Sequence, residues 1–165
     1  MMGAGKSSVA RALAERAGRE HVDTDVLLQQ RFGRSISQIF AVYGEEAFRD
    51  HEHSILKALQ PQACVLSTGG GIVLRDDNWS ELRRLGTSVY LQGDAVLLAE
   101  RLRVSRRKRP LLETDAWEER LAEIMDSRQE RYAMADVTYP IAELTVEEVA
   151  DRLLTVFSDI DAEAP

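Results

Sequence analysis

The chain opens with residue types that bind nucleotide phosphates. Gly5, Lys6 and Ser7 form the second half of the pattern G-x-x-x-x-G-K-[ST], and Gly3 stands two residues before Gly5. In this pattern backbone N–H groups and the lysine hold the phosphate oxygens, while the hydroxyl ligates Mg²⁺. A helix expected to begin near Lys6 adds the positive end of its dipole. The sequence therefore predicts a phosphate site, against the alternative of a glycine-rich helix start with an incidental lysine.

Two carboxylates follow, at the end of a short strand predicted over residues 21–24. Asp23 and Asp25 are two residues apart, so on an extended backbone their side chains project the same way. Open α/β sheets bind ligands at the carboxyl ends of their strands. We predict that Asp23 holds the hydration shell of Mg²⁺ and that Asp25 accepts a hydroxyl proton. The alternative is that one or both simply cap the following helix.

Glycines and two arginines supply further candidates. Residues 69–71 are all glycine and directly follow an apolar run, so a ligand can lie close to the backbone there; a flexible turn is the alternative. Arg49 can bind a substrate carboxylate through two hydrogen bonds, although such arginines are usually solvated or in surface ion pairs. Arg128 shares a helix face with Tyr132, and its alternative is a surface arginine over a packing tyrosine.

A basic stretch covers residues 103–110. A cationic run of this kind can bind nucleic acid. In a chain of net charge −7 that carries a phosphate loop, a mobile lid closing over a nucleotide is the better interpretation. Arg109, just before Pro110, would then bring a guanidinium group to the transferring phosphoryl group.

These residues must be positioned by a fold in which strands alternate with helices, which predicts an α/β fold with a parallel sheet. We expect short strands at 21–24, 63–67, 87–91 and 137–139. We expect helices at 6–18, 25–32, 35 to a break at Gly44, 45–59, 77–85, 94–102, 117–134 and 145–157. The chain is expected to be a single domain over 1–158, with a lid at about 103–117 and a disordered acidic tail at 159–165.

Composition narrows the function classes. The 165 residues are 44% hydrophobic and 30% charged, as in ordinary globular proteins. The net charge of −7 argues against non-specific binding to nucleic acid or to an anionic membrane. The chain has no apolar run of about 20 residues, and we expect no signal peptide, because its first residues are rich in glycine, lysine and serine. The single cysteine, Cys64, rules out an internal disulfide, and we expect a reduced, cytoplasmic setting.

The order of the motifs is more specific than any one of them. A phosphate loop followed by D-T-D, F-R, T-G-G-G, R-P-L-L and R-x-x-x-Y closely resembles the shikimate kinase family over residues 1–154. The resemblance implies a P-loop kinase with a five-stranded parallel sheet, flanking helices and a lid. It implies transfer of the γ-phosphoryl group of ATP to the 3-hydroxyl of shikimate, with Mg²⁺, in aromatic amino acid biosynthesis.

The resemblance also implies a role for each matching residue. ATP would contact Gly3, Ala4, Gly5, Lys6, Ser7, Ser8, Arg101 and Arg109, with Arg101 stacking on adenine. Mg²⁺ would be held by Ser7 and, through water, by Asp23. Shikimate would contact Asp25, Arg49, Gly69, Gly70, Gly71 and Arg128. Catalysis would fall to Lys6, Asp25 and Arg109. The implied partners are ATP and shikimate alone, without nucleic acid or membrane, and the implied state is a monomer.

The sequence departs from the family pattern in two places. The strand that leads into the phosphate loop and the first glycine of the loop would both precede Met1. That strand lies in the middle of the family's sheet, so we expect unpaired backbone groups on two neighbouring strands and an apolar slot between them. We expect the true protein to begin upstream, with Met1 a misassigned start or an artificial boundary. Residues 139–143, which should hold adenine, carry no clear family signature.

Three alternatives stay open on the residues alone. A gluconate kinase of the same fold is disfavoured because Arg49, Arg128 and three glycines suit a cyclic carboxylate. A binding-only pseudokinase is disfavoured because Lys6, Asp23, Asp25 and Arg109 are all retained. A nucleic-acid-binding protein would depend on the basic stretch alone.

Overall fold

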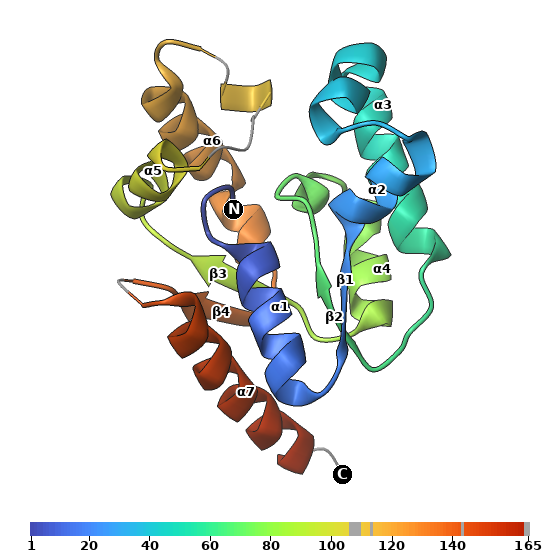
Figure 1. The fold of residues 1–165 in the computed structure, drawn as a ribbon, viewed down its shortest axis with the longest axis vertical. Coiled ribbons are helices and arrows are strands. Elements are labelled where there is room, and N and C mark those ends of the chain that lie inside the picture. Colours follow the sequence, from blue (N-terminus) through green and yellow to red (C-terminus); the bar gives the residue numbers. More distant parts are fainter. Residues whose placement is uncertain (106–109, 113, 143, 164–165) are drawn as a thin grey trace.

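The computed structural model describes residues 1–105, 110–112, 114–142 and 144–163. Its strands form two parallel pairs (Figure 1). β1 (Glu20–Asp23) pairs with β2 (Cys64–Ser67), and β3 (Val89–Gln92) pairs with β4 (Val137–Pro140). The predicted parallel α/β fold is therefore confirmed. Within the described residues β2 and β3 do not pair with each other, so the sheet is split into two halves.

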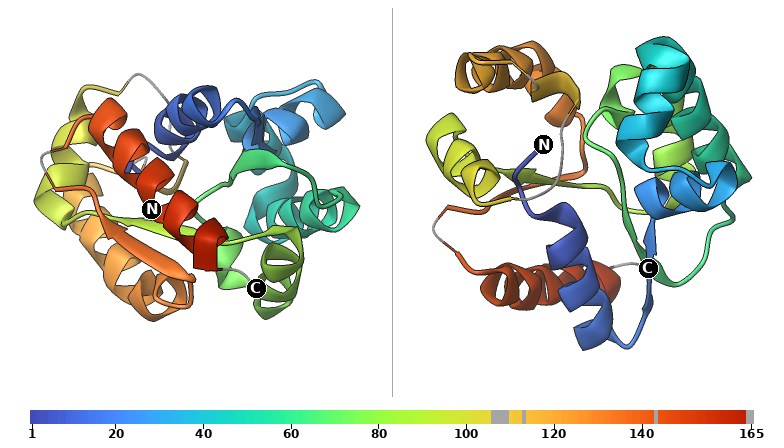
Figure 2. Two further views of the ribbon diagram at one scale, coloured as in Figure 1. Left: turned by 90° about the horizontal axis from the view of Figure 1, so that it is seen from below. Right: turned by 45° about the horizontal axis from the view of Figure 1, so that its top comes forward.

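Helices cover both faces of the strands. Their bounds are α1 (Lys6–Ala17), α2 (Thr24–Phe32), α3 (Ile36–Ala58), α4 (Asp76–Leu85), α5 (Ala95–Arg103), α6 (Trp117–Tyr132) and α7 (Val146–Glu163), with short 3₁₀ turns η1 (Ile72–Leu74) and η2 (Pro110–Leu112). In the view from below, α1 and α7 lie over one face of the strands, and α4 and α6 lie over the other (Figure 2). Among the described residues, no helix is both long and apolar enough to cross a lipid bilayer.

The start of α2 differs from the expectation. The carboxylate of Asp23 accepts the backbone N–H of Asp25 at 2.9 Å and that of Val26 at 3.4 Å, so Asp23 is the N-cap of the helix. Asp25 lies in the first turn of α2. The prediction that both aspartates project from one extended strand is therefore wrong, because the capping hydrogen bonds begin the helix one residue earlier.

Two other boundaries were tested by the structure. The expected break at Gly44 is confirmed, since this residue has φ +77° inside α3, a conformation that glycine adopts without strain. α7 continues to Glu163, beyond the helix end expected at residue 157. The disordered tail at 159–165 stays a prediction. Residues 164–165 lie outside the described residues.

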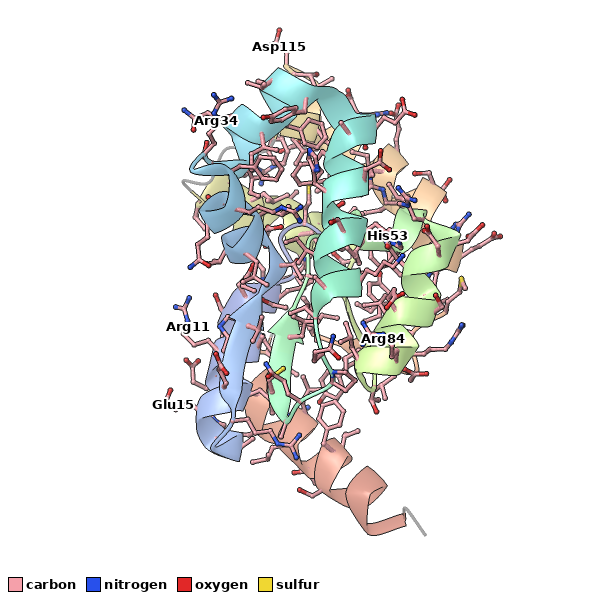
Figure 3. All side chains as sticks on the ribbon, turned by 90° about the vertical axis from the view of Figure 1, so that its right-hand side faces the viewer. Arg11, Glu15, Arg34, His53, Arg84 and Asp115 are labelled. Carbon is pink, nitrogen blue, oxygen red and sulfur yellow. The ribbon has the colours of Figure 1, made fainter. Side chains whose placement is uncertain are left out.

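A small apolar core and a set of polar contacts position α2, α3 and α4. The core consists of Leu28, Ile39, Phe48 and Ile55 and joins α2 to α3. On the other side of α3, His53 and Arg84 lie between α3 and α4 (Figure 3). The Nδ1 atom of His53 lies 2.8 Å from the side-chain oxygen of Asn78, and Arg84 donates to backbone carbonyls at the end of α3. These contacts fix the helix that carries Arg49.

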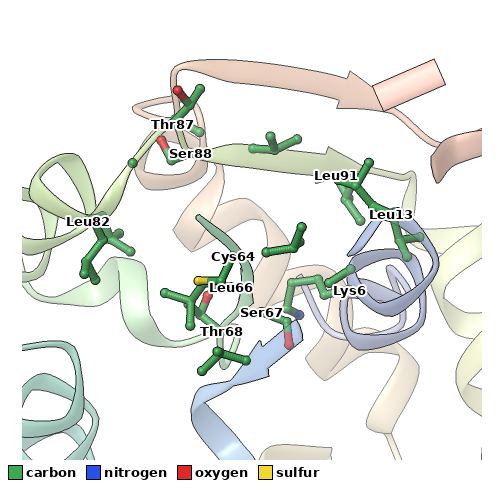
Figure 4. A pocket seen from close by; sticks show the side chains of 18 of the residues that line it. Lys6, Leu13, Cys64, Leu66, Ser67, Thr68, Leu82, Thr87, Ser88 and Leu91 are labelled. Atoms are coloured by element: carbon green, nitrogen blue, oxygen red, sulfur yellow. The ribbon is translucent and has the colours of Figure 1, made fainter. Parts of the chain in front are cut away.

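A cavity of about 570 Å³ lies between the two halves of the sheet (Figure 4). Residues of both β2 and β3 line it, together with apolar side chains of α1, α4 and α7. The apolar slot expected between two neighbouring strands is therefore present, and β2 and β3 are those strands.

Candidate active site

The phosphate loop has the backbone that its glycines predict. Gly3 and Gly5 have φ values of +78° and +77°, in the left-handed region that favours glycine. A Cβ atom at Gly3 would also lie 2.9 Å from the carbonyl oxygen of Leu98. α1 begins at Lys6, and its N-cap, Gly5, has no side chain to satisfy the first N–H groups. The helix therefore offers its N-terminal amides and its dipole to an anion.

Asp23 and Ser7 come together as the sequence predicted. The carboxylate of Asp23 is hydrogen-bonded to the hydroxyl of Ser7 and accepts the hydroxyl of Ser67 at 2.7 Å. Burial alone would raise the pKa of Asp23, but these hydroxyls and the backbone N–H groups of α2 lower it below its usual value. The carboxylate is therefore charged at neutral pH, beside the phosphate loop.

Ser67 is a site residue that the sequence reasoning missed. It ends β2 and lies opposite Asp23 in the register of the β1–β2 pair. Because its single proton goes to Asp23, its oxygen must accept from the Nε2 atom of His21, which lies 3.0 Å away. His21, Ser67 and Asp23 thus form one hydrogen-bonded chain. The pairing of the two strands, which the sequence does not specify, is what creates it.

Arg49 lies in a second group, on α3. Its Nη1 donates to Glu52 at 2.5 Å and its Nη2 to Glu45 at 2.9 Å. The side chain of Arg49 is 12% exposed and that of Glu52 only 1%. Burial raises the pKa of Glu52, and the positive charge of Arg49 offsets only part of that effect. Arg49 is therefore no solvated surface arginine, and Glu52 is a second residue that the sequence reasoning missed.

Side chains press against two of the three glycines, Gly69 and Gly71. A Cβ atom at Gly71 would overlap the guanidinium group of Arg49. A Cβ atom at Gly69 would lie 2.5 Å from Oε1 of Glu52 and 3.1 Å from Oδ1 of Asp25. With these side chains in place, close approach accounts for glycine at positions 69 and 71. Asp25, Arg49 and Glu52 all converge on this stretch.

Arg128 and Tyr132 approach the same glycines from α6. Arg128 is buried, with 7% exposure, so its interpretation as a surface residue is wrong. The hydroxyl of Tyr132 donates to the carbonyl of Gly70. Burial raises the pKa of Tyr132 more than the nearby charge of Arg128 lowers it. The phenol therefore stays protonated and can donate a hydrogen bond. Arg128 interacts with Tyr132 and Glu52, both of which contact the glycines, so cationic side chains on α3 and α6 lie at the glycine stretch.

The phosphate loop and the glycine stretch meet. A Cβ atom at Gly70 would lie 3.7 Å from backbone atoms of Met1 and Met2, which begin the loop. Lys6 donates to the carbonyl of Met1 at 2.8 Å. A bound nucleotide phosphate and a small anion held by Arg49 and Arg128 would therefore be neighbours. Such an arrangement can transfer a phosphoryl group to a hydroxyl of that anion.

The remaining candidates fall nearer the edge of this region. Arg101, on α5, donates to the carbonyl of Leu144 at 3.1 Å, so it contacts the segment that leads into α7. Arg109 and its neighbours at 106–108 lie outside the described residues. At the start of the expected lid, Arg103 forms an ion pair with Glu118 at 2.6 Å.

Comparison with known proteins gives one consistent result. The family model described as shikimate kinase matches residues 2–158. Shikimate kinase from Thermosynechococcus vestitus is 46% identical over 156 residues, covering 93% of this chain and 84% of the relative. Shikimate kinase from Legionella pneumophila is 40% identical over 155 residues, covering 93% and 88%.

Solved structures agree with these sequence relatives. Shikimate kinase from Acinetobacter baumannii, in complex with shikimate, superposes with a TM-score of 0.90 at 33% identity and covers 96% of this chain and 89% of that one. Shikimate kinase from Aquifex aeolicus gives a TM-score of 0.82 at 29% identity, covering 99% and 96%.

The hydrogen bond from Ser67 to Asp23 predicts a pKa change. In Ser67→Ala the pKa of Asp23 should rise, because the hydroxyl favours the charged carboxylate. Asp136 offers a matched control, since Ser88 lowers its pKa in the same way. Ser88→Ala should raise the pKa of Asp136 and leave that of Asp23 unchanged. Carboxyl ¹³C NMR titration of both variants measures the two values, and an unmoved Asp23 in Ser67→Ala would contradict the assignment.

The same bond has a consequence for stability. The folded-state pKa of Asp23 lies below the value of 3.8 expected in the unfolded chain. Its stabilising effect is therefore present above that pH and is lost as the pH falls through the folded-state pKa. In acid unfolding followed by circular dichroism, the free energy of unfolding should therefore fall less in Ser67→Ala than in the parent chain as the pH is lowered through the folded-state pKa of Asp23.

Proposed function

The chain belongs to the shikimate kinase family, and we propose that its site transfers the γ-phosphoryl group of ATP to the 3-hydroxyl of shikimate, giving shikimate 3-phosphate. The activity, ATP-dependent phosphorylation of shikimate in aromatic amino acid biosynthesis, follows from the family. The observation that carries the proposed geometry is the meeting of the phosphate loop with the glycine stretch that Arg49 and Arg128 flank.

ATP is assigned to the phosphate loop. The amides of residues 3–8 and the N-terminus of α1 would hold its phosphate oxygens, and Lys6 would neutralise charge on the β- and γ-phosphates. Arg101 would lie against adenine, beside the segment it already contacts at Leu144. Arg109 would reach the transferring phosphoryl group from the proposed lid, residues 103–117 of the single domain 1–158.

The donor set beside the loop fits Mg²⁺. This ion prefers oxygen ligands and is usually held by one or two carboxylates together with substrate phosphates and water. Asp23 supplies a carboxylate whose lowered pKa keeps it charged, and Ser7 supplies a hydroxyl next to it. We assign Mg²⁺ to Ser7 directly and to Asp23 through water. When bound, the ion would neutralise charge on the phosphates of ATP.

Shikimate is assigned to the glycine stretch. Arg49 and Arg128 would bind its carboxylate, and Glu52 would hold the guanidinium group of Arg49 in place. The backbone of residues 69–71, unobstructed by side chains, would face the ring. Asp25 would bind its hydroxyls from the first turn of α2. The arginines would thus donate to the carboxylate of shikimate, and the carboxylate of Asp25 would accept from its hydroxyls.

Asp25 would act as the base. It would accept the proton of the 3-hydroxyl while the shikimate oxygen bonds to the γ-phosphorus and the bond from that phosphorus to the ADP oxygen breaks. Lys6 and Arg109 would stabilise the charge of the transferring group. Most of the rate enhancement would come from positioning and charge neutralisation, because phosphoryl transfer needs little covalent chemistry from the protein.

Two further parts of the proposal concern the state of the protein. We assign a monomer, which is the state that the resemblance to the family implies. We assign a cytoplasmic setting, where Cys64 remains a free thiol.

A coupled ADP-release assay tests the substrate. The chain should release ADP with shikimate and much more slowly with gluconate, because gluconate is an open chain that cannot present its carboxylate and hydroxyls in the fixed geometry of a ring. ATP without acceptor provides the background rate. Equal rates with both acceptors would favour the gluconate kinase alternative, and ATP binding without turnover would favour a pseudokinase.

Replacing Asp25 with asparagine should lower kcat by about 10²- to 10⁴-fold and leave ATP binding nearly intact, because the amide cannot accept the hydroxyl proton. Steady-state kinetics and nucleotide titration measure the two effects. Asp126→Asn, at an exposed position on α6, is the control and should change neither. Unchanged turnover in Asp25→Asn would refute the assignment of Asp25 as base.

Replacing Arg49 with alanine should raise the KM for shikimate by roughly 30-fold or more, because a buried carboxylate contact is lost. The KM for ATP should change far less. Arg75→Ala is the matched control, since the ion-pair partners of Arg75 are the exposed carboxylates of Asp50 and Asp77. Equal losses for both substrates in Arg49→Ala would mean that the arginine is structural.

A further inference from the structure

Both terminal nitrogens of the Arg49 guanidinium group already donate to carboxylates of the protein. Nη1 donates to Glu52 at 2.5 Å, and Nη2 donates to Glu45 at 2.9 Å. A ligand carboxylate binds an arginine most strongly when it accepts two parallel N–H groups. In the fork of a guanidinium group, such a pair comes either from Nη1 and Nη2 or from Nε and Nη2. Nη2 therefore belongs to both pairs that a ligand carboxylate can use.

Glu45 lies at the nitrogen that such a ligand needs. Nε of Arg49 is buried and has no hydrogen-bond partner among the described residues, so the pair of Nε and Nη2 is only half filled. A ligand carboxylate that completes this pair would lie about 3 Å from Nη2, beside the carboxylate of Glu45. Like charges at such a distance disfavour each other. A ligand carboxylate and Glu45 therefore compete for Arg49.

Of the two glutamates that pair with Arg49, Glu45 is the one that can leave. The side chain of Glu52 is 1% exposed, whereas that of Glu45 is 47% exposed. Glu45 also directly follows Gly44, whose backbone interrupts α3 with φ +77° and ψ +175°. The carboxylate of Glu45 can thus turn into water, where it is solvated at once. Glu52 has no such route, because leaving Arg49 would strand a buried carboxylate.

We propose that Glu45 is an internal competitor of the substrate carboxylate: it pairs with Nη2 of Arg49 in the empty site and gives up this nitrogen when the substrate binds. The inference rests on the proposed function, in which Arg49 binds the carboxylate of shikimate. In the empty site, Glu45 compensates part of the charge of a guanidinium group that is only 12% exposed. On binding, one ion pair replaces another, so the net gain in free energy is smaller than with an unpaired arginine.

Replacing Glu45 with glutamine tests the proposal, because glutamine keeps an acceptor oxygen and loses the charge. A partly exposed ion pair changes an equilibrium constant by about 1.5- to 5-fold. The Kd for shikimate, measured by calorimetry, should therefore fall by about two- to fivefold in Glu45→Gln. The turnover number kcat should stay the same, because Glu45 contacts Arg49 and not the phosphate loop.

Glu46→Gln is the matched control. It removes the same charge at the next position, which is also exposed, while the ion pairs of Arg49 with Glu45 and Glu52 stay in place. The Kd for shikimate should change far less in this variant. An equal fall in both variants would show a general effect of net charge and would overturn the proposal.

A double-mutant cycle shows whether Glu45 acts through Arg49. In the Arg49→Ala background, Glu45→Gln should leave the KM for shikimate nearly unchanged, because the nitrogen for which the two carboxylates compete is gone. A fall in KM as large as in the parent chain would mean that Glu45 acts on the substrate without Arg49, and the competition would be refuted.

Cyclohexanecarboxylate tests the same contact apart from the reaction, since it has a carboxylate and no hydroxyl to phosphorylate. Its Kd is measured from the ¹⁵N–H resonance of Nε of Arg49, which is assigned by its loss in Arg49→Ala. This Kd should also fall by about two- to fivefold in Glu45→Gln and should change far less in Glu46→Gln.

Failure of this inference can be told apart from failure of the proposed function. If the parent chain phosphorylates shikimate and the Kd is unchanged in Glu45→Gln, the function stands and the competitor is refuted. Weaker shikimate binding in Glu45→Gln would also refute it, because Glu45 would then hold Arg49 in position for the substrate. If the parent chain releases no ADP with shikimate, the proposed function fails and cyclohexanecarboxylate decides: tighter binding in Glu45→Gln supports the competitor, and unchanged or absent binding overturns it.

Discussion

The absence of side chains at residues 69–71 is the constraint on which the rest of the site depends. The guanidinium group of Arg49 lies where a Cβ of Gly71 would be, and the carboxylates of Glu52 and Asp25 crowd Gly69 in the same way. Groups from α2 and α3 can lie this close to residues 69 and 71 because glycine carries no side chain, while the α6 residue Tyr132 reaches Gly70 at an ordinary contact distance. The same stretch follows directly on β2, which ends at Ser67 and so links the glycines to Asp23 and the phosphate loop.

Charge balance around these glycines explains why the site suits an anionic substrate. Arg49 and Glu52 are buried together. Burial raises the pKa of Glu52 more than the charge of Arg49 lowers it, so the ion pair offsets only part of the cost of burying the carboxylate. Among the described residues, Oε1 of Glu52 and Nε of Arg49 have no hydrogen-bond partner. Arg128 adds a second buried cation nearby. A ligand carboxylate with neighbouring hydroxyls supplies the acceptors and donors that these groups lack.

The split sheet places a large apolar slot beside this site. Its lining includes Lys6 of the phosphate loop and Ser67, which ends β2 and donates to Asp23, so the slot borders the proposed ATP site.

The sequence by itself determined the alternation of strands and helices, the left-handed loop at Gly3 and Gly5 and the break at Gly44, because these depend on local backbone preferences. The sequence also predicted Asp23 at the ligand site, because it ends a strand and open α/β sheets bind ligands at the carboxyl ends of their strands. Only the tertiary structure decided that Asp25 sits in α2, that Arg49 and Arg128 are buried, and that Ser67 and Glu52 complete the site. Those facts depend on which strands pair and which helices pack together, and no local spacing encodes contacts between residues so distant in the chain.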